Sequence, residues 1–173
     1  KDNVYIWEKG ETRLHENEAA EILREMCQGE YMHPTPVKEG KIELVADIDG
    51  LLKVDSDKMK KINGMRELMI ASRHGNFAVE KGDKLAGTRI IPLVIEREKM
   101  EQAKAVCEGE PILELKPFVH KKVGIVTTGN EVYYHRIEDT FTPVIKEKLA
   151  EYDTEVIGQE ICNDDHEKIT KAI

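Results

Sequence analysis

The chain has 173 residues, of which 26 are Lys or Arg and 34 are Asp or Glu, and its formal net charge is −8. This length is enough for one or two small globular domains, and no apolar run approaches the roughly 20 residues that a membrane span needs. The basic residues form no cluster that could neutralise a phosphate backbone, so we expect neither a nucleic-acid nor a membrane partner. Cys27, Cys107 and Cys162 lie far apart, which predicts free thiols in a reducing, cytoplasmic compartment.

The two ends of the sequence are typical of a fragment. The chain begins at Lys1 and enters directly on the strand-like run Val4–Trp7. Its last apolar residues, Ile169, Ala172 and Ile173, mark one face of a helix that no Gly, Asn or Pro follows. We therefore expect this chain to be a piece of a longer protein.

Residues 1–35 are expected to form a strand and a helix. The helix is predicted over Glu16–Gln28, because apolar side chains recur there at spacings of three and four, and Gly29 is its predicted stop. The following segment, Tyr31–Pro36, contains two prolines and cannot continue the helix. We place a domain boundary in this segment.

Residues 36–110 predict a β-rich module with a flanking helix, because the apolar period changes to two. Alternation over Ile42–Ile48, the dipeptide Asp49-Gly50 and a returning run that ends at Val54 predict a β-hairpin. Pro92 lacks a backbone donor, which indicates an edge position or a bulge. The remaining expected elements are helices over Ser56–Asn63 and Glu96–Glu108 and strands over Leu68–Ser72, Phe77–Val79 and Leu85–Ile95.

The turn within this module is similar to one found in barrel-sandwich modules. Val79–Ala86 resembles the turn of the biotinyl and lipoyl carriers, which indicates a barrel-sandwich-like arrangement. Carriers also present a lysine at a hairpin tip, and this chain has no such hairpin. We therefore do not expect a swinging-arm carrier.

Residues 118–173 predict strand, loop, helix, strand and helix, the first half of a three-layer α/β domain. Val123–Thr127 is a short apolar run of the kind that is buried in a parallel sheet. A helix from Phe141 to Tyr152, with both aromatic residues in the core, leads to a second strand over Glu155–Ile161 and then to a helix that opens at Asp164. Two parallel strands leave a sheet edge uncovered, so we expect further strands.

Two familiar motifs fail in this sequence. The spacing of Gly124 and Gly129 suits a phosphate-binding loop, but Asn130 and Glu131 stand where that loop needs Lys and Ser or Thr. The run from Asp47 to Gly50 begins like a calcium loop, yet its glycine comes too early and the later ligands are missing. We expect neither a nucleoside triphosphatase loop nor an EF-hand.

The loop after the first of the two parallel strands is the candidate site. Ligands of open α/β sheets bind outside the carboxyl ends of strands, which is where Thr127–Val132 lies. Thr127 and Thr128 offer hydroxyl groups, Gly129 allows close approach, and free backbone amides could hold a phosphate. Glu131 suits a magnesium ion or the N–H groups of a ligand. The alternative is a satisfied loop in which the threonines cap turns.

Three motifs follow one another within residues 122–173: Thr128-Gly129-Asn130-Glu131-Val132, Ile137–Phe141 and Asn163-Asp164-Asp165. In these motifs the segment resembles the molybdopterin-binding domain of molybdenum-cofactor biosynthesis proteins. The preceding part, especially Gly82–Leu93, is similar to stand-alone bacterial molybdopterin-binding proteins related to the molybdenum insertase.

This resemblance implies that molybdopterin, a pterin small molecule, is bound and then adenylylated or loaded with molybdate in the presence of Mg²⁺. A recipient molybdoenzyme and a homodimer are the further partners it implies. It assigns catalysis and metal binding to Glu131. With the residues of the candidate loop, the cofactor-binding set is Thr127, Thr128, Gly129, Asn130, Asp139, Asp164 and Asp165.

Two residues depart from the family pattern. Asn130 stands where the family has Asp, and Phe141 where it has Asn. An amide keeps the hydrogen bonding but lacks the charge that attracts a divalent cation, which favours binding over insertase chemistry. The family's Gly-Gly-x-Ser loop would follow Ile173, so we expect this fragment to be inactive. The alternative function is a non-catalytic interaction or sensing protein that keeps the fold.

Overall fold

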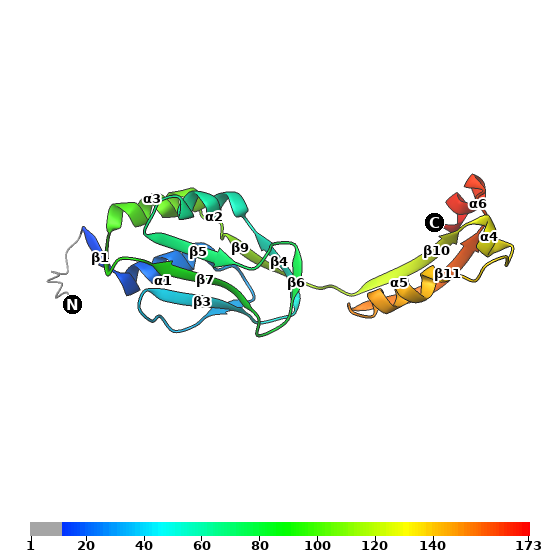
Figure 1. Cartoon of the computed structure of the whole chain (residues 1–173), viewed down its shortest axis with the longest axis horizontal. Coiled ribbons are helices and arrows are strands. Elements are labelled where there is room, and N and C mark those ends of the chain that lie inside the picture. The colour runs from blue at the N-terminus through cyan, green and yellow to red at the C-terminus, as the bar shows by residue number, and fades with distance from the viewer. Residues whose placement is uncertain (1–11) are drawn as a thin grey trace. The chain divides into compact units, whose positions relative to one another are not determined.

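The computed structural model describes residues 12–173 as a mixed α/β protein (Figure 1). It divides into two compact units, one up to Pro117 and one from Phe118 to Ile173. The strand expected over Val4–Trp7 lies outside the described residues. Among the helices of residues 12–173, none combines the length and the apolar composition that crossing a membrane requires.

The first unit consists of short strands with helices against them. Its helices are α1 (Glu16–Cys27), α2 (Ser56–Asn63) and α3 (Arg97–Cys107). Its strands are β1 (Arg13–His15), β2 (Met32–Pro34), β3 (Lys41–Ala46), β4 (Gly50–Val54), β5 (Leu68–Ser72), β6 (Phe77–Val79), β7 (Lys84–Ile90), β8 (Val94–Glu96) and β9 (Leu113–Pro117).

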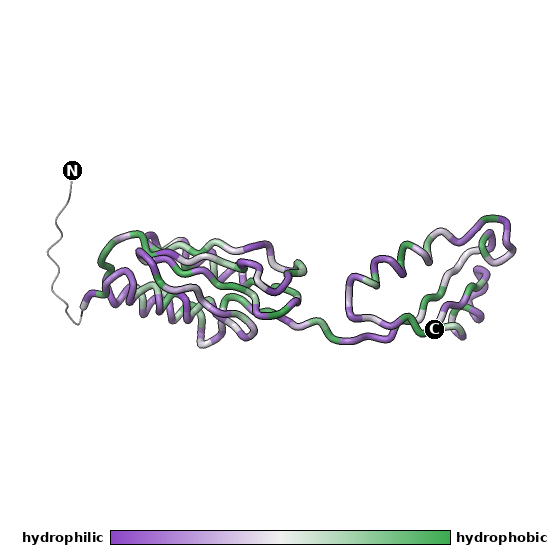
Figure 2. The backbone as a smooth tube through the Cα atoms, turned by 90° about the horizontal axis from the view of Figure 1, so that it is seen from below, coloured by the Kyte–Doolittle hydropathy of each residue, from purple (hydrophilic) through white to green (hydrophobic). Residues whose placement is uncertain are grey.

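The largest sheet of this unit buries one face. Its strand order is β2-β3-β7-β5, with antiparallel pairs throughout. Ile42, Thr88 and Ile70 lie side by side in this register and are buried, whereas Arg89 and Met69 in the next row are exposed. α1 packs against β3 and β7, α2 against β5, and α3 against both helices. The core therefore lies between the sheet and the helices, and Figure 2 shows the alternation of hydropathy along the backbone.

The segment Tyr31–Pro36, where we expected a boundary, contains strand β2 of this same sheet. α1 on one side of the segment and β3 on the other contribute to one hydrophobic core. The compact unit therefore continues across the two prolines. The remaining strands of the unit form a β6-β4-β9 sheet and a β1-β8 pair, and the barrel-sandwich description stays a prediction.

The predicted β-hairpin over Ile42–Val54 is wrong, because β3 and β4 belong to different sheets. Both edges of β3 are occupied, by β2 and β7, while β4 pairs with β6 and β9. The connection is held by other segments: the Asp47 amide donates to the Tyr31 carbonyl at 2.8 Å, and the Asp49 carboxylate accepts from the Lys81 amide at 2.7 Å. Asp49-Gly50 thus forms a corner between sheets.

Two further strands differ from those predicted. The strand expected over Leu85–Ile95 is divided into β7 and β8, and Pro92 lies between them. β9 is not among the expected elements, although Leu113 and Leu115 alternate with charged residues and are buried. The sequence signal for β9 was therefore present but short.

Gly29 has a different role from the predicted helix stop. The C-cap of α1 is Gln28 in an extended conformation. A Cβ atom at Gly29 would lie 2.3 Å from the carbonyl oxygen of Leu113, so the loop after α1 approaches β9 too closely for a side chain. The glycine is required by packing against β9.

We expect Gly29→Ala to lower the free energy of unfolding by about 1–3 kcal/mol, because the backbone of β9 must shift. Urea denaturation followed by circular dichroism measures this change. Gly87→Ala is the matched control, since a Cβ atom at Gly87 would meet no heavy atom within 4 Å. Equal unfolding midpoints for the two variants would contradict the close-approach explanation.

The second unit is built around one pair of parallel strands. Its elements are β10 (Lys121–Thr128), α4 (Asn130–Tyr133), α5 (Phe141–Leu149), β11 (Thr154–Cys162) and α6 (His166–Ala172). β10 and β11 pair in parallel. Thr127 bonds to Thr142 of α5, while Cys162, on the other face, contacts Lys168 of α6. α5 and α6 therefore cover opposite faces, and the predicted strand-helix-strand-helix order is confirmed.

The expectation that Phe141 and Tyr152 are core residues is wrong. Phe141 is 71% exposed and Tyr152 is 44% exposed, with the Tyr152 ring edge-on to Phe118 at 5.3 Å between centroids. α5 instead turns Thr142 toward the sheet. Two strands form a narrow surface, because neighbouring strands lie only about 5 Å apart, and they do not cover the whole apolar face of the helix.

His120, just before β10, pairs with Asp153, just before β11. His120 Nδ1 lies 3.0 Å from Asp153 Oδ1, and its Nε2 lies 3.8 Å from Glu155. The hydrogen bond and the charge of Asp153 raise the pKa of His120 above its ordinary value of 6.5. The contribution of this pair to stability is therefore complete below the unfolded-state pKa and is lost as the pH rises through the raised pKa.

We expect Asp153→Asn to return the pKa of His120 toward 6.5, because the charged acceptor is lost. A titration of the His120 ring by NMR measures the shift. Glu147→Gln on α5 removes the same charge elsewhere and serves as the control. A titration of His120 that is the same in the wild type and in Asp153→Asn would contradict the pairing.

Candidate functional site

The loops that follow β10 and β11 meet at the carboxyl ends of the two strands. Thr128 and Cys162 are paired at the end of the ladder, and the Gly129 amide donates to the Cys162 carbonyl at 3.2 Å. This edge is where open parallel sheets place their ligands. The position that the sequence predicted for the candidate loop is therefore the position it has in the fold.

Gly129 is required by its backbone conformation. Its φ is 144° and its ψ is 129°, a combination that is essentially restricted to glycine. A Cβ atom there would meet only Glu131 Oε2, at 3.9 Å, so space does not exclude a side chain. The strand thus ends in a backbone turn that glycine alone adopts without strain, and α4 begins at the next residue.

A reciprocal contact joins the two loops. The Asn130 amide donates to Asp164 Oδ2 at 3.3 Å, and the Asp164 amide donates to Asn130 Oδ1 at 3.5 Å. Both side chains are exposed. The backbone amides of Gly129 and Asn130, which we expected to be free for a phosphate, are thus engaged within the protein.

Glu131 presents a carboxylate without a protein partner. No hydrogen bond or ion pair of its side chain occurs within the described part of the chain. Its carbonyl accepts from the amides of Arg136 at 2.8 Å and Ile137 at 3.3 Å, which holds the turn after α4. The main chain of Glu131 is therefore fixed while its carboxylate can accept ligand N–H groups or a cation.

Asp139 is the centre of a polar network on the α5 face of the sheet. Its Oδ1 accepts from the amides of Phe141 at 3.0 Å and Thr142 at 3.1 Å. Its Oδ2 accepts from the Thr142 hydroxyl at 2.5 Å, from Gln159 at 2.8 Å and, weakly, from Thr127 at 3.5 Å. These bonds, first those from Thr142, lower the pKa of Asp139 below its ordinary value.

The predicted site residues lie at three separate places in the second unit. Thr128, Gly129, Asn130, Glu131 and Asp164 come together at the carboxyl ends of the strands. Thr127 and Asp139 are bonded to each other and to α5. Asp165 lies apart from both groups and caps α6, since its Oδ1 accepts from the amides of Glu167 at 2.9 Å and Lys168 at 3.2 Å.

Thr142 and Gln159 were missed by sequence reasoning. Thr142 is 4% exposed, although the sequence pattern made its neighbour Phe141 the core residue. The spacing of Asp139 and Thr142, three residues apart, is that of a helix capping pattern and was a usable signal. Gln159 gave no local signal, because it lies on β11 and meets the network only through strand pairing.

Metal binding at Glu131 stays a prediction. Among residues 12–173, no group of three or more His, Cys, Asp or Glu side chains is placed to hold a metal ion. Mg²⁺, however, usually takes one or two carboxylates and completes its shell with waters and substrate phosphates. Glu131 and Asp164 fit that smaller donor set.

Two arginines that could contact an anion, Arg73 and Arg136, have contacts within the protein. The guanidinium of Arg73 donates to the Lys84 carbonyl and to Asp83, both at 2.8 Å. Arg136 lies over the ring of Tyr134, 5.8 Å from its centroid. The thiol of Cys27 is buried, and burial raises its pKa to about 12, so it is not a reactive thiolate.

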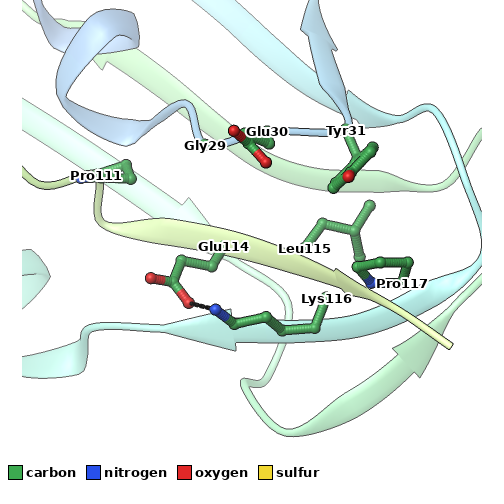
Figure 3. A pocket seen from close by; sticks show the side chains of 8 residues that line it. All are labelled: Gly29, Glu30, Tyr31, Pro111, Glu114, Leu115, Lys116 and Pro117. Carbon is green, nitrogen blue, oxygen red and sulfur yellow. Dashed lines mark ion pairs between the residues drawn. The ribbon is translucent and has the colours of Figure 1, made fainter. Parts of the chain in front are cut away.

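Each unit has a hollow of about 440 Å³ among its described residues. The hollow of the first unit lies along β9 beneath Tyr31, with Leu115 as its buried wall and Glu114 paired to Lys116 at 2.6 Å (Figure 3). The hollow of the second unit lies beside the Asp139 network and includes Lys146. The second hollow is therefore the one that adjoins the predicted site residues.

Residues 124–173 match a family model that is described as a probable molybdopterin binding domain. The match falls within the second unit and includes Thr127–Val132, Asp139 and Asn163–Asp165. It confirms the resemblance inferred for this segment. Comparisons with curated proteins and with solved structures found no match for the chain.

Proposed function

We propose that the protein binds molybdopterin and acts in the biosynthesis or maturation of the molybdenum cofactor, because residues 124–173 match the model of a probable molybdopterin binding domain. The observation that carries this proposal is the meeting of two loops at the carboxyl ends of β10 and β11. There the Asn130–Asp164 contact lies next to Gly129 and to the free carboxylate of Glu131. This is the edge at which a parallel sheet receives its ligand.

The site residues take different roles in the proposal. Thr128 and Gly129 line the ligand, and Glu131 accepts its N–H groups or holds Mg²⁺ together with Asp164 and the ligand phosphate. Asp139 positions the loop, because its oxygens are already bonded to Thr127, Thr142 and Gln159. Bound Mg²⁺ would neutralise phosphate charge.

Binding ranks ahead of catalysis in this proposal. A molybdotransferase-like or adenylyltransferase-like activity, with molybdate as the substrate of the first, would depend on Glu131. Asn130 contributes an amide where a second carboxylate would attract a divalent cation. A cytoplasmic location, a recipient molybdoenzyme and a homodimer belong to the same proposal, and the buried free thiols support a reducing compartment.

A second candidate function is that of a non-catalytic interaction protein. The observation in its favour is the exposed apolar surface of α5, where Phe141, Val144 and Ile145 are 71%, 49% and 40% exposed. Contiguous exposed apolar patches commonly mark interaction sites. Ligand binding separates the two candidates, because the interaction protein would not bind a pterin.

Anaerobic calorimetry with molybdopterin and the 173-residue chain tests the proposed function. We expect saturable binding that strengthens when Mg²⁺ is added. Lys116→Ala, in the first unit, is a control that should bind like the wild type. A folded chain, verified by circular dichroism, that gives no binding heat at any Mg²⁺ concentration would overturn the proposal.

We expect Asn130→Asp to strengthen Mg²⁺ binding about tenfold, because it adds a carboxylate at a side chain that already contacts the backbone amide of Asp164. Magnesium titration followed by calorimetry measures the affinity. Asn130→Ser, which adds no charge, should leave it near the wild-type value. Equal affinities for the two variants would show that this position does not limit cation binding.

A further inference from the structure

One buried polar atom lacks a partner in the part of the chain that the structure describes. Asn163 Oδ1 is inaccessible to solvent and accepts no hydrogen bond. An unpaired buried acceptor lowers stability, because it has lost water without gaining a donor. Such an atom in a native fold therefore needs an explanation.

The neighbours of Asn163 along the chain belong to the candidate site. The carbonyl of Cys162 accepts from the Gly129 amide, and Asp164 is joined to Asn130. The two bonds between Asn130 and Asp164, at 3.3 and 3.5 Å, are long for N–H···O contacts. The turn that contains Asn163 is thus joined to the Asn130 side of the site by long hydrogen bonds.

We propose that Asn163 is a ligand-binding residue, whose Oδ1 accepts a hydrogen bond from an N–H donor of the ligand when the turn moves. This inference rests on the proposed function, since the amino-substituted pterin ring supplies such donors. A site that pairs a buried acceptor with a ligand N–H group rejects analogues without that group, because the acceptor is then left unpaired. Asn163 therefore selects for a ligand with an N–H group at this point.

A ligand-binding role of Asn163 predicts a combination of effects on stability and affinity that a purely structural role does not. Removal of an acceptor that is unpaired in the free protein should leave stability unchanged or increase it, whereas removal of a paired acceptor lowers it. Removal of a ligand contact should weaken binding. Asn163→Ala is accordingly expected to unfold at the same or a higher urea concentration than the wild type, and to bind molybdopterin at least tenfold more weakly.

Two further variants make the test decisive. Asn163→Asp retains an acceptor oxygen and is expected to bind within about threefold of the wild type. Glu160→Ala, which truncates an exposed side chain of β11, controls for general effects. Calorimetry gives the affinity, and urea denaturation gives the stability.

The outcomes distinguish this inference from the proposed function. Wild-type affinity in Asn163→Ala, or a loss of stability in that variant without weaker binding, overturns the role of Asn163 alone. A wild-type chain that binds no molybdopterin overturns both. Weaker binding with unchanged stability, together with retained binding in Asn163→Asp, supports the proposal.

Discussion

Replacement of Asp139 by alanine is expected to unfold residues 118–173 at a markedly lower urea concentration than in the wild type. Five donors converge on this carboxylate, from the amides of Phe141 and Thr142 and from the side chains of Thr142, Gln159 and Thr127. Few side chains of this unit are buried, so the network is a large part of what joins α5 to the strands. Urea denaturation followed by circular dichroism measures the loss.

The same carboxylate predicts a dependence on pH. Since the pKa of Asp139 is lowered in the folded state, its contribution is present above the unfolded-state pKa of about 4 and is lost as the pH falls through the folded-state pKa. Asp139→Asn should lower the stability of residues 118–173 at neutral pH and reduce the loss of that stability as the pH falls. Glu147→Gln removes an exposed carboxylate of α5 outside this network and serves as the control. If the stability of Asp139→Asn fell with decreasing pH as steeply as that of the wild type, this explanation would be wrong.

Glu131→Gln is expected to weaken molybdopterin binding in the presence of Mg²⁺ by about ten- to a hundredfold, the range of one lost charge-assisted contact. The structure predicts no accompanying loss of stability, because the carboxylate of Glu131 has no hydrogen-bond or ion-pair partner within residues 12–173. Calorimetry with and without Mg²⁺ measures the affinity. This separation of function from stability is the opposite of the result expected for Asp139.

Glu138→Gln provides the matched control for Glu131, because it removes one carboxylate from the connection between α4 and α5. It should bind within a factor of two or so of the wild type. If Glu131→Gln bound as tightly as Glu138→Gln, Glu131 would be excluded as a ligand or metal contact, although Asn130 and Asp164 would remain candidates.

Local patterns predicted the elements well. The helix over Ser56–Asn63 and the strands over Leu68–Ser72 and Phe77–Val79 have the predicted bounds. Helix periodicity, caps and short apolar runs depend on residues that are close in the chain, so they can be read from the sequence. The parallel pairing of β10 and β11 also followed, because a strand-helix-strand segment favours it.

Pairing between distant segments could not be read in the same way. The hairpin over Ile42–Val54 had the correct alternation and turn residues, yet both edges of β3 are taken by strands from elsewhere in the chain. Phe141 had the correct helical spacing for a core position, but the face it occupies is left uncovered by two strands. In both cases the local signal was correct and the neighbouring surface decided the outcome.

For the candidate site, too, local features were predictable from the sequence, whereas contacts between distant residues were not. The sequence by itself determined which loop follows β10 and that Gly129 belongs there, and with the family resemblance it predicted Asn130, Glu131, Asp139, Asp164 and Asp165 as site residues. Only the tertiary structure decided which of these carboxylates is available to a ligand. Asp139 and Asp165 are occupied by internal donors and Glu131 is not, because hydrogen bonds are distributed by spatial proximity, which residue spacing alone does not specify.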